Sequence, residues 1–248
     1  MGADERRRVL EQVEAGTERV LATLGKLSEQ ELRGPSALPG WTRGHVATHI
    51  ARNADSLWNL LEWARTGVEI PQYPSVEARN ADLEAGAGRG GSELVEDVRA
   101  SAARFSEQFR ALPPEAADVQ VRAMLGWEQP AWYVLYRRWH EVEVHHVDLA
   151  AGYGPADWPD PYVRWALGGT LRDLAALPVG SRGELDGHRL VATESGDETR
   201  LGDGPRITGS GRALLGWLSG RTSGAGLAMR PDGALPAPPA WPFPPSTF

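Results

Sequence analysis

The chain has 248 residues, a net charge of −7 at neutral pH and no cysteine. The missing cysteine excludes disulfides, cysteine-ligated zinc, iron–sulfur clusters and a cysteine nucleophile supplied by the chain itself. The negative charge and the scattered arginines argue against a nucleic-acid-binding protein, which needs a concentrated basic face to neutralise phosphates. No apolar run approaches the length that spans a membrane, so we expect a cytoplasmic protein that binds neither nucleic acid nor membrane.

The first part of the chain is predicted to be a helical bundle. Apolar spacing favours four helices, separated by segments rich in proline and glycine, over residues 4–32, 43–66, 91–111 and 130–150. Thr42 is a candidate N-cap of the second helix. The segment 67–90 is longer than most connections in a compact domain, which favours a functional or disordered loop.

A proline-rich segment at residues 153–161 predicts a domain boundary, with one domain over 1–153 and another over 160–248. Beyond it the pattern predicts a helix at Tyr162–Leu177, a strand at His188–Glu194, a helix at Ser210–Ser219 and a strand at Gly226–Arg230. Gly220 is the expected C′ residue of the second of these helices. The last dozen residues are rich in proline and are predicted to be irregular.

Two motifs suggest functions that the surrounding sequence does not support. His45 and His49 have the spacing of the two zinc ligands of zincin proteases, but the glutamate that would act as general base is missing between them. Residues 86–91 match the dinucleotide-binding spacing G-x-G-x-x-G. The residues before them are polar and helix-like, so we interpret this segment as a flexible loop.

Three residues are candidate metal ligands. Glu141 and His145 are four residues apart, so a helix would place both on one face. His49 lies in an earlier helical segment, on an apolar stripe that points inward. Together they could bind a divalent metal and leave one coordination position open for chemistry. Taken singly they have ordinary interpretations, His49 as a core histidine and the others as part of a solvated polar face that comprises Arg138, Glu141, His145 and Asp148.

Two segments carry a resemblance to a known family. Residues 40–55 (GWTRGHVATHIARNAD) and 138–149 (RWHEVEVHHVDL) resemble the metal-binding domain of the mycothiol-dependent maleylpyruvate isomerases, which belong to the DinB-like group of four-helix metalloproteins. Residues 207–221 resemble the second domain of that family. The resemblance implies an α+β fold in which a DinB-like four-helix bundle is followed by a small, sterol-carrier-like α/β domain.

The resemblance also implies roles for individual residues. His49, Glu141 and His145 would be the zinc ligands, and Arg79 and Arg221 would be active-site arginines. Without the resemblance, Arg79 would be taken for part of a loop salt bridge and Arg221 for a cation near a helix C-terminus.

The implied activity is a zinc- and mycothiol-dependent cis–trans isomerisation of a small anionic substrate such as maleylpyruvate, a step of gentisate degradation. In that reaction the thiolate of mycothiol would add to the double bond, allow rotation and leave again. A mycothiol S-transferase and a non-catalytic DinB-like metal-binding stress protein are the alternatives. Two histidines and a glutamate would also accept Mn²⁺, Fe²⁺, Co²⁺ or Ni²⁺.

Overall fold

The computed structural model describes residues 1–240, and the chain divides into two compact units, Met1–Gly152 and Tyr153–Phe248. Residues 241–248, which the predictions of an irregular C-terminus and of a second domain include, lie outside the described residues. Between residues 1 and 240, no helix is long and apolar enough to cross a membrane.

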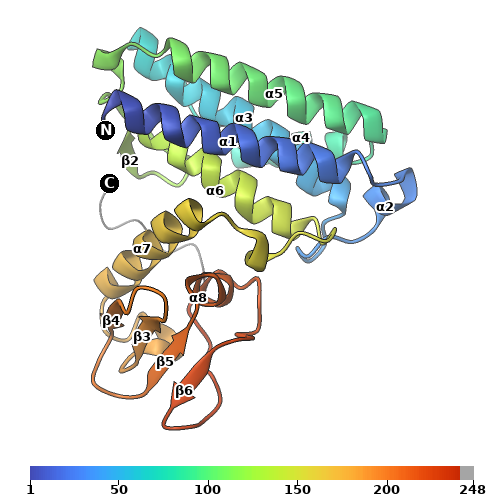
Figure 1. The fold of residues 1–248 in the computed structure, drawn as a ribbon. Helices are drawn as coiled ribbons and strands as arrows, with labels where there is room; N and C mark the ends of the chain where they lie inside the picture. The colour runs from blue at the N-terminus through green and yellow to red at the C-terminus, as the bar shows by residue number, and fades with distance from the viewer. Residues whose placement is uncertain (241–248) are drawn as a thin grey trace. The chain divides into compact units, whose positions relative to one another are not determined.

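The first unit is a four-helix bundle, as predicted (Figure 1). Its helices are α1 (Ala3–Leu24), α2 (Glu29–Arg33), α3 (Arg43–Thr66), α4 (Val76–Ala87), α5 (Gly91–Ala111) and α6 (Tyr133–Asp148). The four long helices form the bundle, in which α3 packs against α5 and α6, and α1 packs against the same two helices. Its core is aliphatic and includes Val20, Leu24, Val46, Ile50, Leu94, Val98, Val142 and Leu149.

The prediction of one continuous helix over 4–32 is wrong. Helix α1 ends at Leu24, and the short helix α2 starts after Ser28. The Ser28 hydroxyl accepts a hydrogen bond from the Glu31 backbone N–H, and the Glu31 carboxylate accepts one from the Ser28 backbone N–H at 2.8 Å. This capping box satisfies N–H groups that a helix start leaves free, so it favours a new helix there.

The prediction that 67–90 is a loop is also wrong in part, because Val76–Ala87 forms α4, with Ser75 as its N-cap. This helix packs against α3 at two glycines. A Cβ atom at Gly44 would clash with the Ala87 carbonyl oxygen, and one at Gly86 would clash with the Thr48 side chain. Of the glycine-rich segment 86–91, Gly86 belongs to α4 and Gly91 begins α5, so only its middle is a connection.

A small hairpin that was not predicted lies between α5 and α6. After the 3₁₀ turn η1 (Pro114–Ala116), strands β1 (Gln120–Arg122) and β2 (Glu128–Pro130) pair antiparallel, with Val121 opposite Gln129. Each strand has only three residues, too short for an alternating pattern to be recognised. Helix α6 therefore begins at Tyr133, three residues later than predicted.

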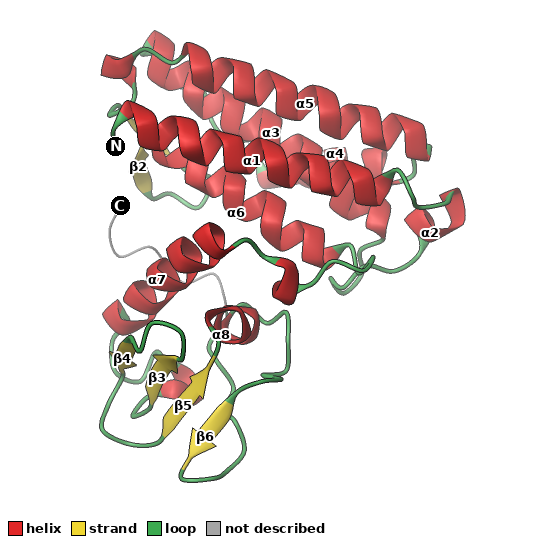
Figure 2. Ribbon diagram, in the orientation of Figure 1, coloured by secondary structure: helices red, strands yellow, loops and turns green. Residues whose placement is uncertain are grey.

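The second unit is a four-stranded sheet packed with two helices (Figure 2). Its elements are η2 (Pro155–Asp157), α7 (Asp160–Ala176), η3 (Gly183–Leu185), β3 (Arg189–Ala192), β4 (Glu198–Arg200), β5 (Arg206–Gly209), α8 (Gly211–Leu218) and β6 (Ala228–Arg230). The strand order is β4-β3-β5-β6, with β3 and β5 parallel and the other pairs antiparallel.

The predicted helices and strands of this unit are confirmed to within a few residues, whereas β4 and β5 were not predicted. Gly220 follows α8 with a φ of +72°, which confirms its prediction as the C′ residue. With its helical bundle and mixed sheet, the chain has the α+β fold that was expected.

Candidate metal centre

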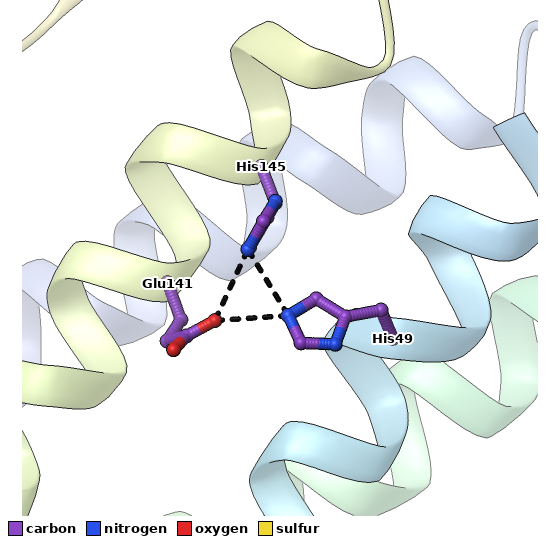
Figure 3. A group of neighbouring side chains, drawn as sticks. All are labelled: His49, Glu141 and His145. Carbon is purple, nitrogen blue, oxygen red and sulfur yellow. Dashed lines mark hydrogen bonds and ion pairs between the residues drawn. The ribbon is translucent and has the colours of Figure 1, made fainter. Parts of the chain in front are cut away.

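Side chains from two helices of the bundle converge on one point. His49 comes from α3, and Glu141 and His145 come from consecutive turns of α6 (Figure 3). The His49 Nε2 atom lies 3.0 Å from Glu141 Oε2 and 3.0 Å from His145 Nε2. The third distance, between His145 Nε2 and Glu141 Oε2, is 3.2 Å. The three residues thus form a compact triad of two ring nitrogens and one carboxylate oxygen.

Local sequence and helix packing explain this convergence. The Thr42 hydroxyl accepts a hydrogen bond from the His45 backbone N–H, which confirms Thr42 as the N-cap of α3. On α6, the buried Arg138 joins the two helices, because its Nη1 atom donates to the Ile50 carbonyl at 2.7 Å. Since Ile50 follows His49 directly, this bond fixes the position of His49 along the axis of α6.

The triad is buried on one side and accessible on the other. The side chain of His49 is 7% exposed, whereas those of His145 and Glu141 are 16% and 24% exposed. The interpretation of their helix face as a solvated polar stripe is wrong, because Arg138 and Asp148 are 0% and 1% exposed. Glu141 has the most exposed side chain of the triad.

Burial and charge set the protonation of the triad. Burial and, after it, the charge of His145 lower the pKa of His49 to about 4, against the opposing effect of Glu141. Burial also acts to lower the pKa of His145, but hydrogen bonds with Asp148 and Glu141 outweigh it and raise this pKa to about 9. Burial acts to raise the pKa of Glu141, yet hydrogen bonds with His145 and His49 hold it well below its usual range. At neutral pH the metal-free triad thus contains a neutral His49, a protonated His145 and an ionised Glu141.

This donor set fits a divalent metal ion. His49, Glu141 and His145 each offer one ligand atom, and all three atoms lie within 4.8 Å of one another. The other ring nitrogen of His145, Nδ1, lies 2.8 Å from Asp148 Oδ2. A carboxylate in that position fixes the ring and directs the lone pair of Nε2 to the metal, as is usual for metal-binding histidines. Three protein ligands leave room for an external one.

Of the two arginines implied by the resemblance, the structure places Arg79 at the triad. It lies on α4, and its Nη2 atom is 3.5 Å from His49 Nδ1. Its guanidinium lies over the Tyr73 ring, 5.7 Å from the ring centroid. Arg221 lies in the second unit, just after α8, where its Nη1 atom donates to the Ser219 carbonyl at 2.6 Å.

The other histidines near the triad have different partners. The His45 ring accepts a hydrogen bond from the Thr42 backbone N–H at 3.2 Å and stacks on Trp41, so it completes the cap of α3. The His146 Nε2 atom lies 2.7 Å from the Thr23 hydroxyl on α1. These contacts distinguish both residues from the three members of the triad.

Three polar residues near the triad or its neighbours were not predicted: Arg137 lies one helical turn before Glu141, Gln72 contacts Arg137, and Tyr73 lies under the Arg79 guanidinium. Arg137 stands four residues before Glu141, so the helical spacing that joined Glu141 to His145 could have found it as well. Gln72 and Tyr73 lie in an irregular segment, where no periodicity marks a residue that points inward.

Comparisons with known proteins agree with the geometry. The sequence profile described as the mycothiol maleylpyruvate isomerase N-terminal domain matches residues 13–150. Among solved structures, the crystal structure of the mycothiol-dependent maleylpyruvate isomerase superposes with a TM-score of 0.85 at 30% identity, over 97% of this chain and 98% of that one. A histidine-to-alanine variant of such an isomerase gives a TM-score of 0.84 at 29% identity, over the same shares of the two chains.

A search of curated proteins found no match. The profile match spans α3 and α6 and so includes the whole triad, and the overall fold agrees over nearly the full length of both chains. The chain belongs to the mycothiol maleylpyruvate isomerase family.

Proposed function

We propose that the protein is a zinc- and mycothiol-dependent cis–trans isomerase that converts maleylpyruvate, or a similarly small unsaturated dicarboxylate, to its trans isomer. The observation that carries this proposal is the convergence of His49, Glu141 and His145, from two helices, in a chain of this family. Two imidazoles and one carboxylate form a donor set typical of catalytic zinc, which keeps one coordination position open.

The chain's own residues would hold and orient the metal. When bound, zinc and mycothiol together would supply a thiolate at neutral pH, the nucleophile that a chain without cysteine lacks. His49, Glu141 and His145 would be the ligands, and Asp148 would keep the proton of His145 on Nδ1. The partial exposure of Glu141 leaves the access that the external thiol and substrate need.

Cationic side chains would bind and polarise the substrate. Addition to a double bond conjugated with a carbonyl moves negative charge onto an oxygen, and a guanidinium near that oxygen lowers the energy of the transition state. The Arg79 guanidinium lies 3.5 Å from the His49 ring, so Arg79 would meet this need. We assign Arg221 to the same role because of the family resemblance, since a planar guanidinium also binds carboxylates with two parallel hydrogen bonds.

The test is an isomerisation assay on metal-loaded protein freed of small thiols. We expect no turnover of maleylpyruvate without thiol, and catalytic turnover, with many substrates converted per thiol, once mycothiol is added. Isomerisation in the absence of any thiol would refute the proposal. Consumption of one mycothiol per substrate would identify a thiol transferase instead, and no reaction at all with bound metal would favour a non-catalytic metal-binding protein.

A further inference from the structure

Arg137 is a guanidinium beside the triad whose hydrogen bonds are incomplete. It lies on α6 one helical turn before Glu141 and is partly buried. Its Nη2 atom is 3.4 Å from the side-chain oxygen of Gln72. Its Nη1 atom is buried, and within residues 1–240 no group accepts a hydrogen bond from it. A buried donor without an acceptor is costly, so such a group needs a functional explanation.

The contact with Gln72 orients Arg137 without neutralising it. Gln72 is 5% exposed and its amide is fixed on both sides. The amide nitrogen donates to the Ser56 hydroxyl at 3.3 Å, and the amide oxygen accepts a hydrogen bond from the Met124 backbone N–H at 2.9 Å. The guanidinium is therefore held toward a neutral partner, and its charge stays available to an anion.

Glu141 and Arg138 are the charged neighbours of Arg137 on its own helix. Burial lowers the pKa values of Arg137 and Arg138, and Glu141 is the strongest of the charges that oppose this effect on either residue. The Glu141 carboxylate is already engaged with His49 and His145. Arg79 adds a third guanidinium, which lies over the ring of Tyr73. Arg138 is completely buried and bound to Ile50 and Asn53, so the guanidiniums left for a ligand near the triad are those of Arg137 and Arg79. Two such groups favour an anionic ligand with more than one carboxylate.

We propose that Arg137 binds a carboxylate of the substrate through its free Nη1 group and so selects for dicarboxylates. The inference rests on the proposed function, to which it adds a residue that determines specificity. Tyr73 is a further polar neighbour of this subsite, because it lies close enough to Glu141 and Arg79 for their charges to act on its hydroxyl group. The metal triad acts at the double bond, whereas Arg137 holds the end of the substrate.

The experiment uses the metal-loaded enzyme and two probes. Calorimetry without thiol measures the Kd of maleate, a cis dicarboxylate that carries two charges, and of monomethyl maleate, which carries one. Steady-state assays with mycothiol measure kcat and KM for maleylpyruvate. In Arg137→Gln we expect the Kd of maleate and the KM to rise about tenfold or more, the effect of losing one charge-assisted hydrogen bond. Metal content should equal that of the wild type.

Three further variants make the result specific. Arg137→Lys keeps the charge but loses the planar group. Its Kd for maleate should therefore lie between those of the wild type and Arg137→Gln. Gln72→Glu keeps the shape of the side chain and the acceptor for Met124, but it places a carboxylate beside Arg137. It should therefore weaken maleate binding without any change to Arg137. Arg99→Gln removes an exposed arginine of α5 and should change none of these values.

Two results would overturn the inference. One is a Kd for maleate in Arg137→Gln within twofold of the wild-type value, and the other is loss of metal in that variant, which would show that Arg137 acts through Glu141. Preference of the wild type for maleate over its monomethyl ester, abolished in Arg137→Gln, would support it. A wild type that binds maleate through Arg137 but never isomerises maleylpyruvate would reject the proposed function and leave the dicarboxylate subsite in place.

Discussion

Arg138 on α6 donates a hydrogen bond from Nη1 to Asn53 Oδ1 on α3, at 2.9 Å, and both side chains are almost completely buried. The same nitrogen binds the Ile50 carbonyl, next to His49. A buried charge is tolerated only where polar groups replace water around it. This pair therefore ties together the two helices that carry the triad.

Removal of the Asn53 side chain should lower the stability of the protein. In Asn53→Ala the Arg138 guanidinium loses an acceptor but stays buried, so we expect the free energy of unfolding to fall by about 2–3 kcal/mol. Urea denaturation of the purified protein measures it. Asn59→Ala, on the same helix but with only long hydrogen bonds to the loop at residues 71–72, should cost less. Equal losses in the two variants would contradict the role of Asn53.

The triad should be the site that retains metal. Purified protein should contain about one equivalent of divalent metal, and His49→Ala, Glu141→Ala and His145→Ala should each lose most of it while their circular dichroism stays that of a folded helical protein. Elemental analysis checks the metal. His45→Ala and His146→Ala should keep the metal, because these rings contact Thr42 and Thr23 instead. Wild-type metal content in all three triad variants would exclude the site.

Asp148 should tune the affinity of the site without binding the metal. In Asp148→Ala the His145 ring loses the acceptor that orients it, so we expect the metal Kd to rise about 10- to 100-fold. Asp148→Asn keeps an oxygen acceptor and should have a smaller effect. Competition with a chromogenic chelator measures both constants, and an unchanged Kd in Asp148→Ala would contradict this role.

Metal affinity should rise with pH. The pKa of His145 in the metal-free protein is raised to about 9, so below that pH a proton occupies the nitrogen that the metal needs. Because this proton must leave, the apparent association constant should increase about tenfold per pH unit up to pH 9 and then level off. Titrations in buffers of different ionisation enthalpy should show about one proton released per metal at pH 7.5. A flat profile between pH 6 and pH 9 would show that His145 carries no proton in this range and would contradict its raised pKa.

Arg79 and Arg221 should affect turnover but not metal binding. Arg79→Lys and Arg221→Lys keep a positive charge and lose the planar guanidinium, so kcat/KM for maleylpyruvate should fall about tenfold, equivalent to about 1.4 kcal/mol. Metal content should be normal in both variants. Wild-type kinetics in Arg221→Lys would remove the second unit from the proposed mechanism, whereas wild-type kinetics in Arg79→Lys would show that its proximity to His49 is incidental.

The features that the sequence determined by itself are local. The four-residue spacing of Glu141 and His145 puts them on one face of any helix, and the apolar neighbours of His49 mark its face as inward. Thr42 caps the start of α3 through a hydrogen bond with a nearby residue, and Gly220 terminates α8 through its own backbone angles. Such features depend on a few consecutive residues, so a pattern is enough to predict them.

The tertiary structure alone decided which faces meet. The stripe of Arg138 and Asp148 has the sequence pattern of a solvated surface, yet α3 covers Arg138 and supplies its acceptors. The position of Arg79 depends on α4 and on the close approach that Gly44 and Gly86 allow, and that of Gln72 depends on distant groups at Ser56 and Met124. Helical periodicity describes the faces of one helix but carries no information about the neighbour that buries them, because that choice depends on the packing of the whole bundle.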